Sequence, residues 1–205
     1  GALLKEPTPP DYITASGINY YGHQCGVGVT EGSPLGGGFL AHVCEQWECA
    51  AQPLIDAGIR SVSARIGMIL SSQGGALTKM LPAFKLGLGG VIGAGSQHMS
   101  WVSLPDAVRI LLLAIEDKSI KGPLNVASPQ PLTNRVFTKS LGAALKRPTF
   151  FPMPALAVKA LFGQMGIEVL CSDVGVLPKV LLNRGFEWDF TDIKSCFDAC
   201  LAKQF

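Results

Sequence analysis

Strand and helix signals alternate along this 205-residue chain, and this alternation constrains the fold more than any other feature. Tyr12–Ser16 and Gly122–Ala127 have short strand patterns, and Ile59–Leu70 is rich in apolar and β-branched residues with little polar alternation. A strand of the latter kind is typical of a parallel sheet covered on both faces. Because helical patterns separate the strands, we predict an α/β fold with βα units around a parallel sheet.

The predicted helices carry recognisable start and stop signals. Gly58 can end the first helix, Thr133 can cap the fourth, and Thr191 and Asp192 can cap the last. The helical patterns cover Phe39–Ala57, Ala76–Leu86, Pro105–Ile115, 134–145 and Ile193–Leu201.

Composition shifts near residue 150. From Phe151 onward, prolines and glycines break the apolar helical patterns into short pieces, so we expect a small, mainly helical lobe over 151–205 after a sheet domain over 1–150.

A doubly wound sheet has about five or six strands, and only about three parallel candidates are visible here. Residues 1–150 are therefore expected to form only the C-terminal part of such a sheet.

Charge and hydropathy exclude several classes of protein. With 48% hydrophobic and 16% charged residues, the chain can bury a substantial core. A net charge of +2, with scattered Lys and Arg, argues against nucleic acid as a partner. No apolar run approaches the roughly 20 residues that span a bilayer, and the first ten residues lack a signal-peptide pattern. We expect a soluble, cytoplasmic protein, or one of an organelle stroma or matrix.

The six cysteines do not form a recognisable metal or disulfide framework. No Cys-x-x-Cys pair is present, and the three histidines are isolated in sequence. Cys196 and Cys200 stand four residues apart on a predicted helix, where small buried thiols are the ordinary interpretation. We expect reduced cysteines and no bound metal.

The segment Gly74–Trp101 combines an amphipathic helical pattern with a run of glycines and ends in polar and aromatic residues. Glycines permit positive φ and close backbone approach, which suits a site built from loops. The segment predicts a substrate site with Lys79, Gln97, His98 and Trp101 as contacts. A plain surface hairpin is the alternative interpretation.

Several ordered motifs together resemble a known family. They are SGINYYG (Ser16–Gly22), FLAHVCEQWECAA (Phe39–Ala51), ARIGMIL (Ala64–Leu70), GGALTKMLPAFKLGLGGVIGAG (Gly74–Gly95), MSWVSLPD (Met99–Asp106), GPLNVASPQPLTN (Gly122–Asn134) and VLPKVLLNRGFEW (Val176–Trp188). The series resembles an atypical NAD(P)-dependent epimerase/dehydratase family of the extended short-chain dehydrogenase/reductases.

That resemblance implies a Rossmann-like domain over 1–150, a small family-specific C-terminal domain over 151–205, and NADP or NAD as cofactor. It also implies that the chain corresponds to the C-terminal two thirds of a family member, beyond the strand, GxxGxxG turn and helix that hold the dinucleotide pyrophosphate. Gly87–Gly95 cannot replace that turn, because these glycines follow a predicted helix instead of a strand. The 205-residue chain is expected to bind a dinucleotide weakly, and to self-associate or be completed by an N-terminal segment.

The Tyr-x-x-x-Lys pair of the wider superfamily is absent. Gln24 and Cys25 follow Tyr20 and Tyr21 at that spacing, and the corresponding helix carries Cys44 and Glu48, or Val43 and Trp47, at the matching positions. In the superfamily the lysine lowers the pKa of the tyrosine so that its phenol can exchange a proton with the substrate.

The candidate site residues follow from the resemblance and from strand ends. Ser16 matches the serine that ends the central strand in the superfamily and is assigned a catalytic role; a strand-end turn is the alternative interpretation. Tyr20 or Tyr21 could replace the lost phenol, or the pair could pack in the core; Glu48 could be an acid or base, or a solvated surface residue. The residues expected near the cofactor are Thr14, Ala15, Ser16, Arg65, Gly67 and Met68.

Two further residues have alternative interpretations. Arg65 is either part of a buried ion pair or a ligand contact, and Asp106 fits a helix N-terminus better than a catalytic acid. The predicted function is an NAD(P)-dependent oxidoreductase or epimerase-like protein acting on a small or nucleotide-linked polar substrate. The alternative is a nucleotide-binding or regulatory protein that has kept the fold and lost the chemistry.

Overall fold

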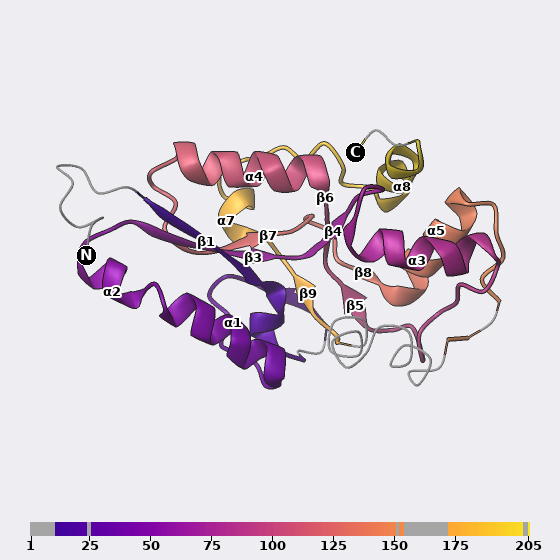
Figure 1. Cartoon of the computed structure of the whole chain (residues 1–205), viewed down its shortest axis with the longest axis horizontal. Coiled ribbons are helices and arrows are strands. Elements are labelled where there is room, and N and C mark those ends of the chain that lie inside the picture. The colour runs from indigo at the N-terminus through magenta and orange to yellow at the C-terminus, as the bar shows by residue number, and fades with distance from the viewer. Residues whose placement is uncertain (1–10, 24–25, 151, 154–171, 203–204) are drawn as a thin grey trace.

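A three-stranded parallel sheet forms the centre of the protein (Figure 1). The computed structural model describes residues 11–23, 26–150, 152–153, 172–202 and 205. The strands are β1 (Tyr12–Gly17), β3 (Ser61–Ile66) and β7 (Gly122–Val126), in the order β1-β3-β7. Helix α4 (Leu104–Glu116) covers one face of the sheet, and α1 (Phe39–Cys49) and α2 (Gln52–Asp56) lie on the other side. The α/β prediction is confirmed.

The predicted strand over 59–70 is two strands that pair with different partners. β3 pairs with β1 and β7, whereas β4 (Met68–Leu70) pairs with β6 (Trp101–Ser103). The change occurs at Gly67, whose N–H donates to the Val126 carbonyl at 3.0 Å, while the next N–H donates to the Ser100 carbonyl at 2.9 Å. A Cβ at position 67 would lie 3.0 Å from that Ser100 oxygen, so the close backbone approach favours glycine.

The predicted helix over 39–57 is also divided in two. It stops after Cys49 and resumes as α2, which has Pro53 in its first turn. A proline has no N–H to donate and is tolerated at a helix start but not in its interior, so the break precedes it. Gly58 then ends α2 with a φ of 81°, as the sequence predicts.

A second core joins helices from distant parts of the chain. Helices α3 (Gly75–Lys85), α5 (Asn134–Ala144) and α8 (Ile193–Leu201) pack together around Leu70 and Trp101. This core combines residues from both sides of position 150. Much of the predicted lobe, 154–171, lies outside the described residues.

The helix caps follow the sequence signals. The Thr133 side chain accepts a hydrogen bond from the Val136 N–H at the start of α5. At the start of α8, Asp192 accepts one from the Ser195 N–H, and Thr191 is not the cap. Each cap satisfies a backbone donor that the helix itself cannot pair.

Short strands place segment 172–176 against the end of the sheet. β9 (Gly175–Val176) pairs with β2 (Val27–Val29), and β5 (His98–Met99) pairs with β8 (Leu132–Thr133). The Ser100 hydroxyl donates to the Val174 carbonyl and accepts from the Val176 N–H, both at 2.8 Å. Between β1 and β2 the chain forms the 3-10 helix η2 (Ile18–Tyr21), and α7 (Lys179–Leu182) follows β9.

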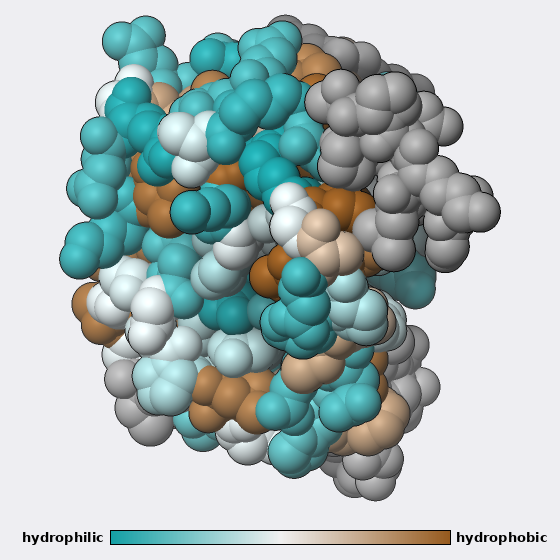
Figure 2. Space-filling model, turned by 90° about the vertical axis from the view of Figure 1, so that its left-hand side faces the viewer, coloured by the Kyte–Doolittle hydropathy of each residue, from teal (hydrophilic) through white to brown (hydrophobic). Residues whose placement is uncertain are grey.

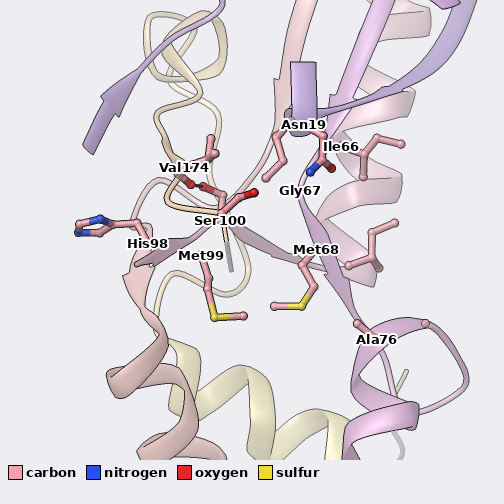
Figure 3. Close-up of a pocket in the computed structure, with 13 residues that line it drawn as sticks. Asn19, Ile66, Gly67, Met68, Ala76, His98, Met99, Ser100 and Val174 are labelled. Atoms are coloured by element: carbon pink, nitrogen blue, oxygen red, sulfur yellow. Dashed lines mark hydrogen bonds between the residues drawn. The ribbon is translucent and has the colours of Figure 1, made fainter. Parts of the chain in front are cut away.

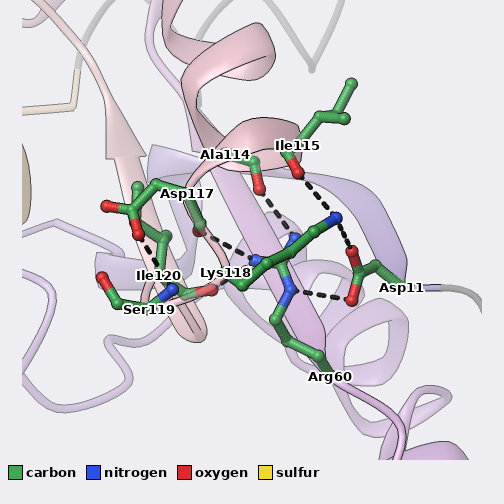
Figure 4. Close-up of polar contacts among 8 residues, drawn as sticks. All are labelled: Asp11, Arg60, Ala114, Ile115, Asp117, Lys118, Ser119 and Ile120. Atoms are coloured by element: carbon green, nitrogen blue, oxygen red, sulfur yellow. Dashed lines mark hydrogen bonds and ion pairs between the residues drawn. The ribbon is translucent and has the colours of Figure 1, made fainter.

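Arg60 connects several elements at the amino end of the sheet. Its guanidinium donates to the Ala114 carbonyl in the last turn of α4 and to the carbonyls of Asp117 and Ile120, which follow that helix. It also pairs with Asp11, just before β1 (Figure 4). Lys118 also pairs with Asp11. A cation at these carbonyls complements the negative end of the helix dipole.

The exterior at this end of the protein is largely hydrophilic, with separate apolar patches (Figure 2). In the part of the chain that the structure describes, no helix has the length and apolar character needed to cross a membrane.

Candidate functional site

Three polar residues lie side by side at the carboxyl ends of the central strands. Ser16 of β1 pairs in register with Arg65 of β3, and Arg65 pairs with Asn125 of β7. Paired residues of neighbouring parallel strands project to the same face, and all three side chains are buried. The carboxyl edge of an open parallel sheet is where such folds bind ligands.

Glu48 of α1 lies against this polar row. Its two carboxylate oxygens accept from Nε and Nη2 of Arg65, each at 2.8 Å, and one of them also accepts from the Ser16 hydroxyl at 2.8 Å. The structure thus brings together Ser16, Glu48 and Arg65, and of the two interpretations of Arg65 it shows the buried ion pair. Glu48 is not on a solvated surface.

Both tyrosines of the SGINYYG motif contact Arg65. The guanidinium carbon lies 3.5 Å from the centre of the Tyr20 ring, an arrangement in which the cation faces the π-system. The Tyr21 hydroxyl accepts from Arg65 Nη1 at 3.0 Å and donates to Asn125 Oδ1 at 2.6 Å. Tyr21 is fully buried, whereas Tyr20 is partly buried.

Protonation states in this network are set by burial and by the ion pair. Burial raises the pKa of Tyr21 above its ordinary value, against the opposing effect of Arg65. Burial alone would lower the pKa of Arg65, but hydrogen bonds to Glu48 and Tyr21 hold it above its usual value. At neutral pH the Tyr21 phenol is therefore protonated and is not primed to accept a proton.

Glu31 is a buried carboxylate that the sequence interpretation did not single out. Its oxygens accept from the backbone N–H groups of Asn125, Lys179 and Val180. Its own carbonyl accepts from Arg65 at 3.4 Å. Glu31 therefore fixes the loop after β2 to β7 and to the start of α7, and nothing in its local sequence distinguishes it from a surface glutamate.

A cavity of about 330 Å³ lies at the carboxyl end of β3 and the start of β4. Its walls come from η2, the β3–β4 junction, the start of α3, β5 with Ser100, and the segment after residue 171 (Figure 3). The lining residues are Ile18, Asn19, Ile66, Gly67, Met68, Ile69, Gly75, Ala76, His98, Met99, Ser100, Ser172 and Val174.

His98 stands at the rim of this cavity and is fixed by Asp173. The Asp173 carboxylate contacts both the backbone N and Nδ1 of His98 at 2.8 Å, and it accepts from the Gly26 N–H at 3.3 Å. Burial raises the pKa of Asp173, but these hydrogen bonds outweigh burial and hold it below its ordinary value. Asp173 remains ionised at neutral pH and orients the imidazole.

Three of the predicted residues, Gly67, Met68 and His98, line the cavity. Ser16, Tyr20, Tyr21, Glu48 and Arg65 form the adjacent polar network and are not among its lining residues. Thr14 and Ala15 lie earlier on β1, half-buried and exposed respectively.

The predicted substrate contacts other than His98 lie elsewhere. Lys79 is exposed on α3. The Gln97 side chain donates to the Ile92 carbonyl, and the backbone carbonyl of Gln97 accepts from the Asn134 N–H. Trp101 is fully buried and its indole N–H donates to the Gln130 carbonyl, so the ring has a core position without a surface for a ligand. Only the two ends of the Gly74–Trp101 segment reach the cavity, and the glycines at 87–95 do not line it.

Asp106 has the structural role expected of a residue at a helix N-terminus. It is fully buried at the start of α4, where it accepts from the Ser103 hydroxyl and from the backbone N–H groups of Asp189 and Phe190. The guanidinium of Arg109 also contacts the Asp106 carboxylate, with Nη1 at 3.3 Å from Oδ1. Asp106 thereby fastens the C-terminal segment to α4.

The buried cysteines Cys196 and Cys200 lie in the helical core. A hydrogen bond with Cys200, together with burial, raises the pKa of Cys196, which favours the neutral thiol. Among the described residues, no group of three or more His, Cys, Asp or Glu side chains is placed to hold a metal ion.

Comparison with known proteins identifies the family. The epimerase family protein SDR39U1 of Homo sapiens is 35% identical over 203 residues, which cover 98% of this chain and 69% of the human protein. This chain belongs to that epimerase family. A Mycobacterium leprae member is 41% identical over 192 residues, which cover 94% of this chain and 62% of the relative. The chain thus spans less than two thirds of the mycobacterial protein's length.

Solved structures of epimerase family proteins have the same fold. The crystal structure of human SDR39U1 (isoform 2) with NADPH superimposes with a TM-score of 0.87 at 34% identity, covering 98% of this chain and 68% of that one. A nucleoside-diphosphate sugar epimerase from Corynebacterium glutamicum gives a TM-score of 0.75 at 33% identity, covering 95% of this chain and 38% of that one. Residues 153–200 match a domain of unknown function (DUF1731).

Proposed function

We propose that this protein is an NAD(P)-dependent oxidoreductase or epimerase-like enzyme that converts a small substrate in the cavity beside Gly67. The observation that carries the proposal is the position of that cavity at the carboxyl end of β3, next to the buried Ser16–Glu48–Arg65 network. Membership of a family with an NADPH-bound structure supports a nicotinamide cofactor.

The cavity suits the nicotinamide end of the cofactor. Ile66 and Met68 offer apolar surface for a flat ring, and the backbone at Gly67 allows close approach. Among the described residues, the glycines at 87–95 lie between α3 and β5, so they do not form a strand–turn–helix cradle for the pyrophosphate. The bound nicotinamide would supply hydride transfer at its C4 carbon.

The chain's own residues would orient the substrate and exclude water. Apolar walls from several elements shield a reacting carbon, and the Asp173-bound His98 fixes the rim. The buried network holds the ends of β1, β3 and β7 in register behind the cavity. A direct catalytic role for Ser16, through its hydroxyl, stays a prediction.

One observation favours a second candidate, a nucleotide-binding protein without turnover. Glu48 is one of two residues that the resemblance aligns with the lysine of the superfamily, and it is engaged by Arg65 instead of activating a phenol. Burial also raises the pKa of Tyr21, whereas proton exchange at neutral pH calls for a lowered one. Cofactor binding without oxidation or reduction of any carbonyl compound would support this candidate.

The proposal is tested with nicotinamide mononucleotide, which is the half of the cofactor that the cavity would hold. Titration of the ¹⁵N-labelled chain should shift the backbone signals of Gly67, Ala76 and Met99, with millimolar affinity. Ala76→Phe, which fills the cavity from α3, should abolish these shifts. Shifts confined to the other hollow between α3 and α8, near Thr78 and Lys85, or no saturable shift, would overturn the proposal.

A further inference from the structure

The described lining of the cavity lacks the side chains that are charged at neutral pH. None of its described lining residues is Lys, Arg, Asp or Glu. The nearby cation Arg65 is buried and bound to Glu48, and Lys79 is on the exposed surface of α3. A diphosphate or carboxylate enclosed in such a cavity would lose its hydration without gaining an ion pair, which is costly. Nicotinamide mononucleotide avoids this cost if its ring enters the cavity and its phosphate stays in solvent.

The walls are instead adaptable and apolar. Figure 3 shows the Met68 and Met99 side chains reaching toward each other across the cavity, with Ile66 on the same side as Met68. Thioether side chains are flexible and polarisable, so they fit apolar groups of differing shape. The space of about 330 Å³ lies at the lower end of the range for small-molecule pockets.

Asn19 supplies a polar group at the sheet end of the cavity. Its carboxamide is turned toward Gly67 (Figure 3). Two of the other polar groups already have partners, since the Ser100 hydroxyl bonds Val174 and Val176, and Nδ1 of His98 faces Asp173. A carboxamide has both a donor and an acceptor, so it can pair with a ketone oxygen and with the hydroxyl of the corresponding alcohol.

We infer that the cavity takes an uncharged, mainly apolar compound with one carbonyl or hydroxyl group, which Asn19 holds, and that it does not take a nucleotide-linked or carboxylate substrate. The inference rests on the proposed function, because it assigns the substrate class of the same site. Asn19 is the specificity-determining residue, and it selects for one neutral oxygen on an apolar body.

The test uses four matched probes: acetophenone, 1-phenylethanol, ethylbenzene and phenylglyoxylate. Binding is followed by chemical-shift changes of Gly67, Ala76 and Met99 in the ¹⁵N-labelled chain. Acetophenone and 1-phenylethanol should bind with similar affinity, and phenylglyoxylate should bind at least about tenfold more weakly because its charge is not compensated. Uridine diphosphate glucose should cause no saturable shift.

The role of Asn19 is tested with Asn19→Leu, and the matched control is Asn183→Leu at an exposed position after α7. Asn19→Leu should weaken acetophenone binding by about tenfold and leave ethylbenzene binding unchanged, since only the first probe loses a hydrogen bond. The control variant should bind both probes like the parent chain. An unchanged backbone spectrum outside the cavity confirms that each variant is folded.

The inference is overturned by equal binding of phenylglyoxylate and acetophenone, by saturable binding of uridine diphosphate glucose at the cavity, or by an equal loss for both probes in Asn19→Leu. The proposed function fails separately, through the absence of nicotinamide mononucleotide binding. If the mononucleotide binds and the neutral probes do not, the cavity holds the cofactor and the substrate class is wrong.

Discussion

Glu48 and Arg65 bind each other through two parallel hydrogen bonds, each 2.8 Å long, across the space between α1 and β3. Arg65 is only 3% exposed, so removal of the carboxylate would leave a guanidinium without its counter-charge in the interior. Glu48→Leu should therefore lower the free energy of unfolding by about 3–5 kcal/mol in urea denaturation.

The matched control for this variant is Glu45→Gln on the same helix, where the carboxylate pairs with an exposed histidine, His42. Glu45→Gln should lower the free energy of unfolding by less than about 1 kcal/mol. If Glu48→Leu keeps the stability of the parent chain, Glu48 is not a structural counter-ion and the acid–base role predicted from the sequence gains support.

Ser16→Ala should lower stability by about 1 kcal/mol, because its hydroxyl donates one hydrogen bond to Glu48 and Arg65 still supplies two. Nicotinamide mononucleotide binding should be unchanged, since Ser16 does not line the cavity. A thermal melt and the titration are measured on the same variant. In a catalytically competent form of the protein, a fall in turnover of tenfold or more without loss of stability would restore a direct catalytic role.

Local sequence patterns suffice for residues that act on their immediate neighbours. Thr133, Asp192 and Gly58 act within one turn of their own position, and their capping or stopping roles are confirmed. The break at Gly67 was not predicted. It arises because β3 pairs with β7 whereas β4 pairs with β6, and both partners are distant in sequence from residues 59–70. Periodicity within 59–70 carries no signal for that change.

The candidate site was predictable only in part for the same reason. Strand ends pointed to Ser16 and Arg65, and the structure brings these together with Tyr20, Tyr21 and Glu48. The cavity itself is assembled from five separate segments, so its apolar character could not be deduced from any one of them. Asn19 lies within a recognised motif, but its side chain reaches the cavity only because η2 lies beside Gly67.

Asp106→Ala should be among the most destabilising single changes at the start of α4. It should lower the free energy of unfolding, measured by urea denaturation, by about 3 kcal/mol. The change removes the acceptor for the Ser103 hydroxyl and for two backbone N–H groups at residues 189 and 190. Asp189→Ala is the control, because Asp189 is half exposed and its carboxylate pairs with Arg109 at the surface. Equal stability of the two variants would show that the buried acceptor contributes little.

Acid should weaken the contacts of Asp11. Hydrogen bonds from Arg60 and then Lys118 lower the pKa of Asp11 to about 2, against about 3.9 for an unperturbed Asp. The stabilisation is present above the unfolded-state pKa and is lost as the pH falls through about 2. The difference in unfolding free energy between the parent chain and Asp11→Asn should shrink between neutral pH and about pH 2. A difference that stays constant over this range would contradict the lowered pKa.

The 205-residue chain should self-associate. In the described sheet β1 is an edge strand, and nearby α1 exposes Phe39 and Trp47. Exposed edge strands and apolar side chains promote pairing between chains. Sedimentation velocity should show a dimer or larger species that Trp47→Glu weakens, whereas Leu112→Glu on α4 should not. A concentration-independent monomer would refute this prediction.

Arg60 has a consequence for how the edge strand opens. The residue before β1, Asp11, is held by Arg60, and Ser16 near the end of β1 is held by Glu48. Strand ends usually fray first, and their amide protons then exchange with solvent faster than those of the core. With both ends anchored to helices and to β3, β1 should open together with the whole sheet, so its paired amides should exchange at the slow rate of the central strand.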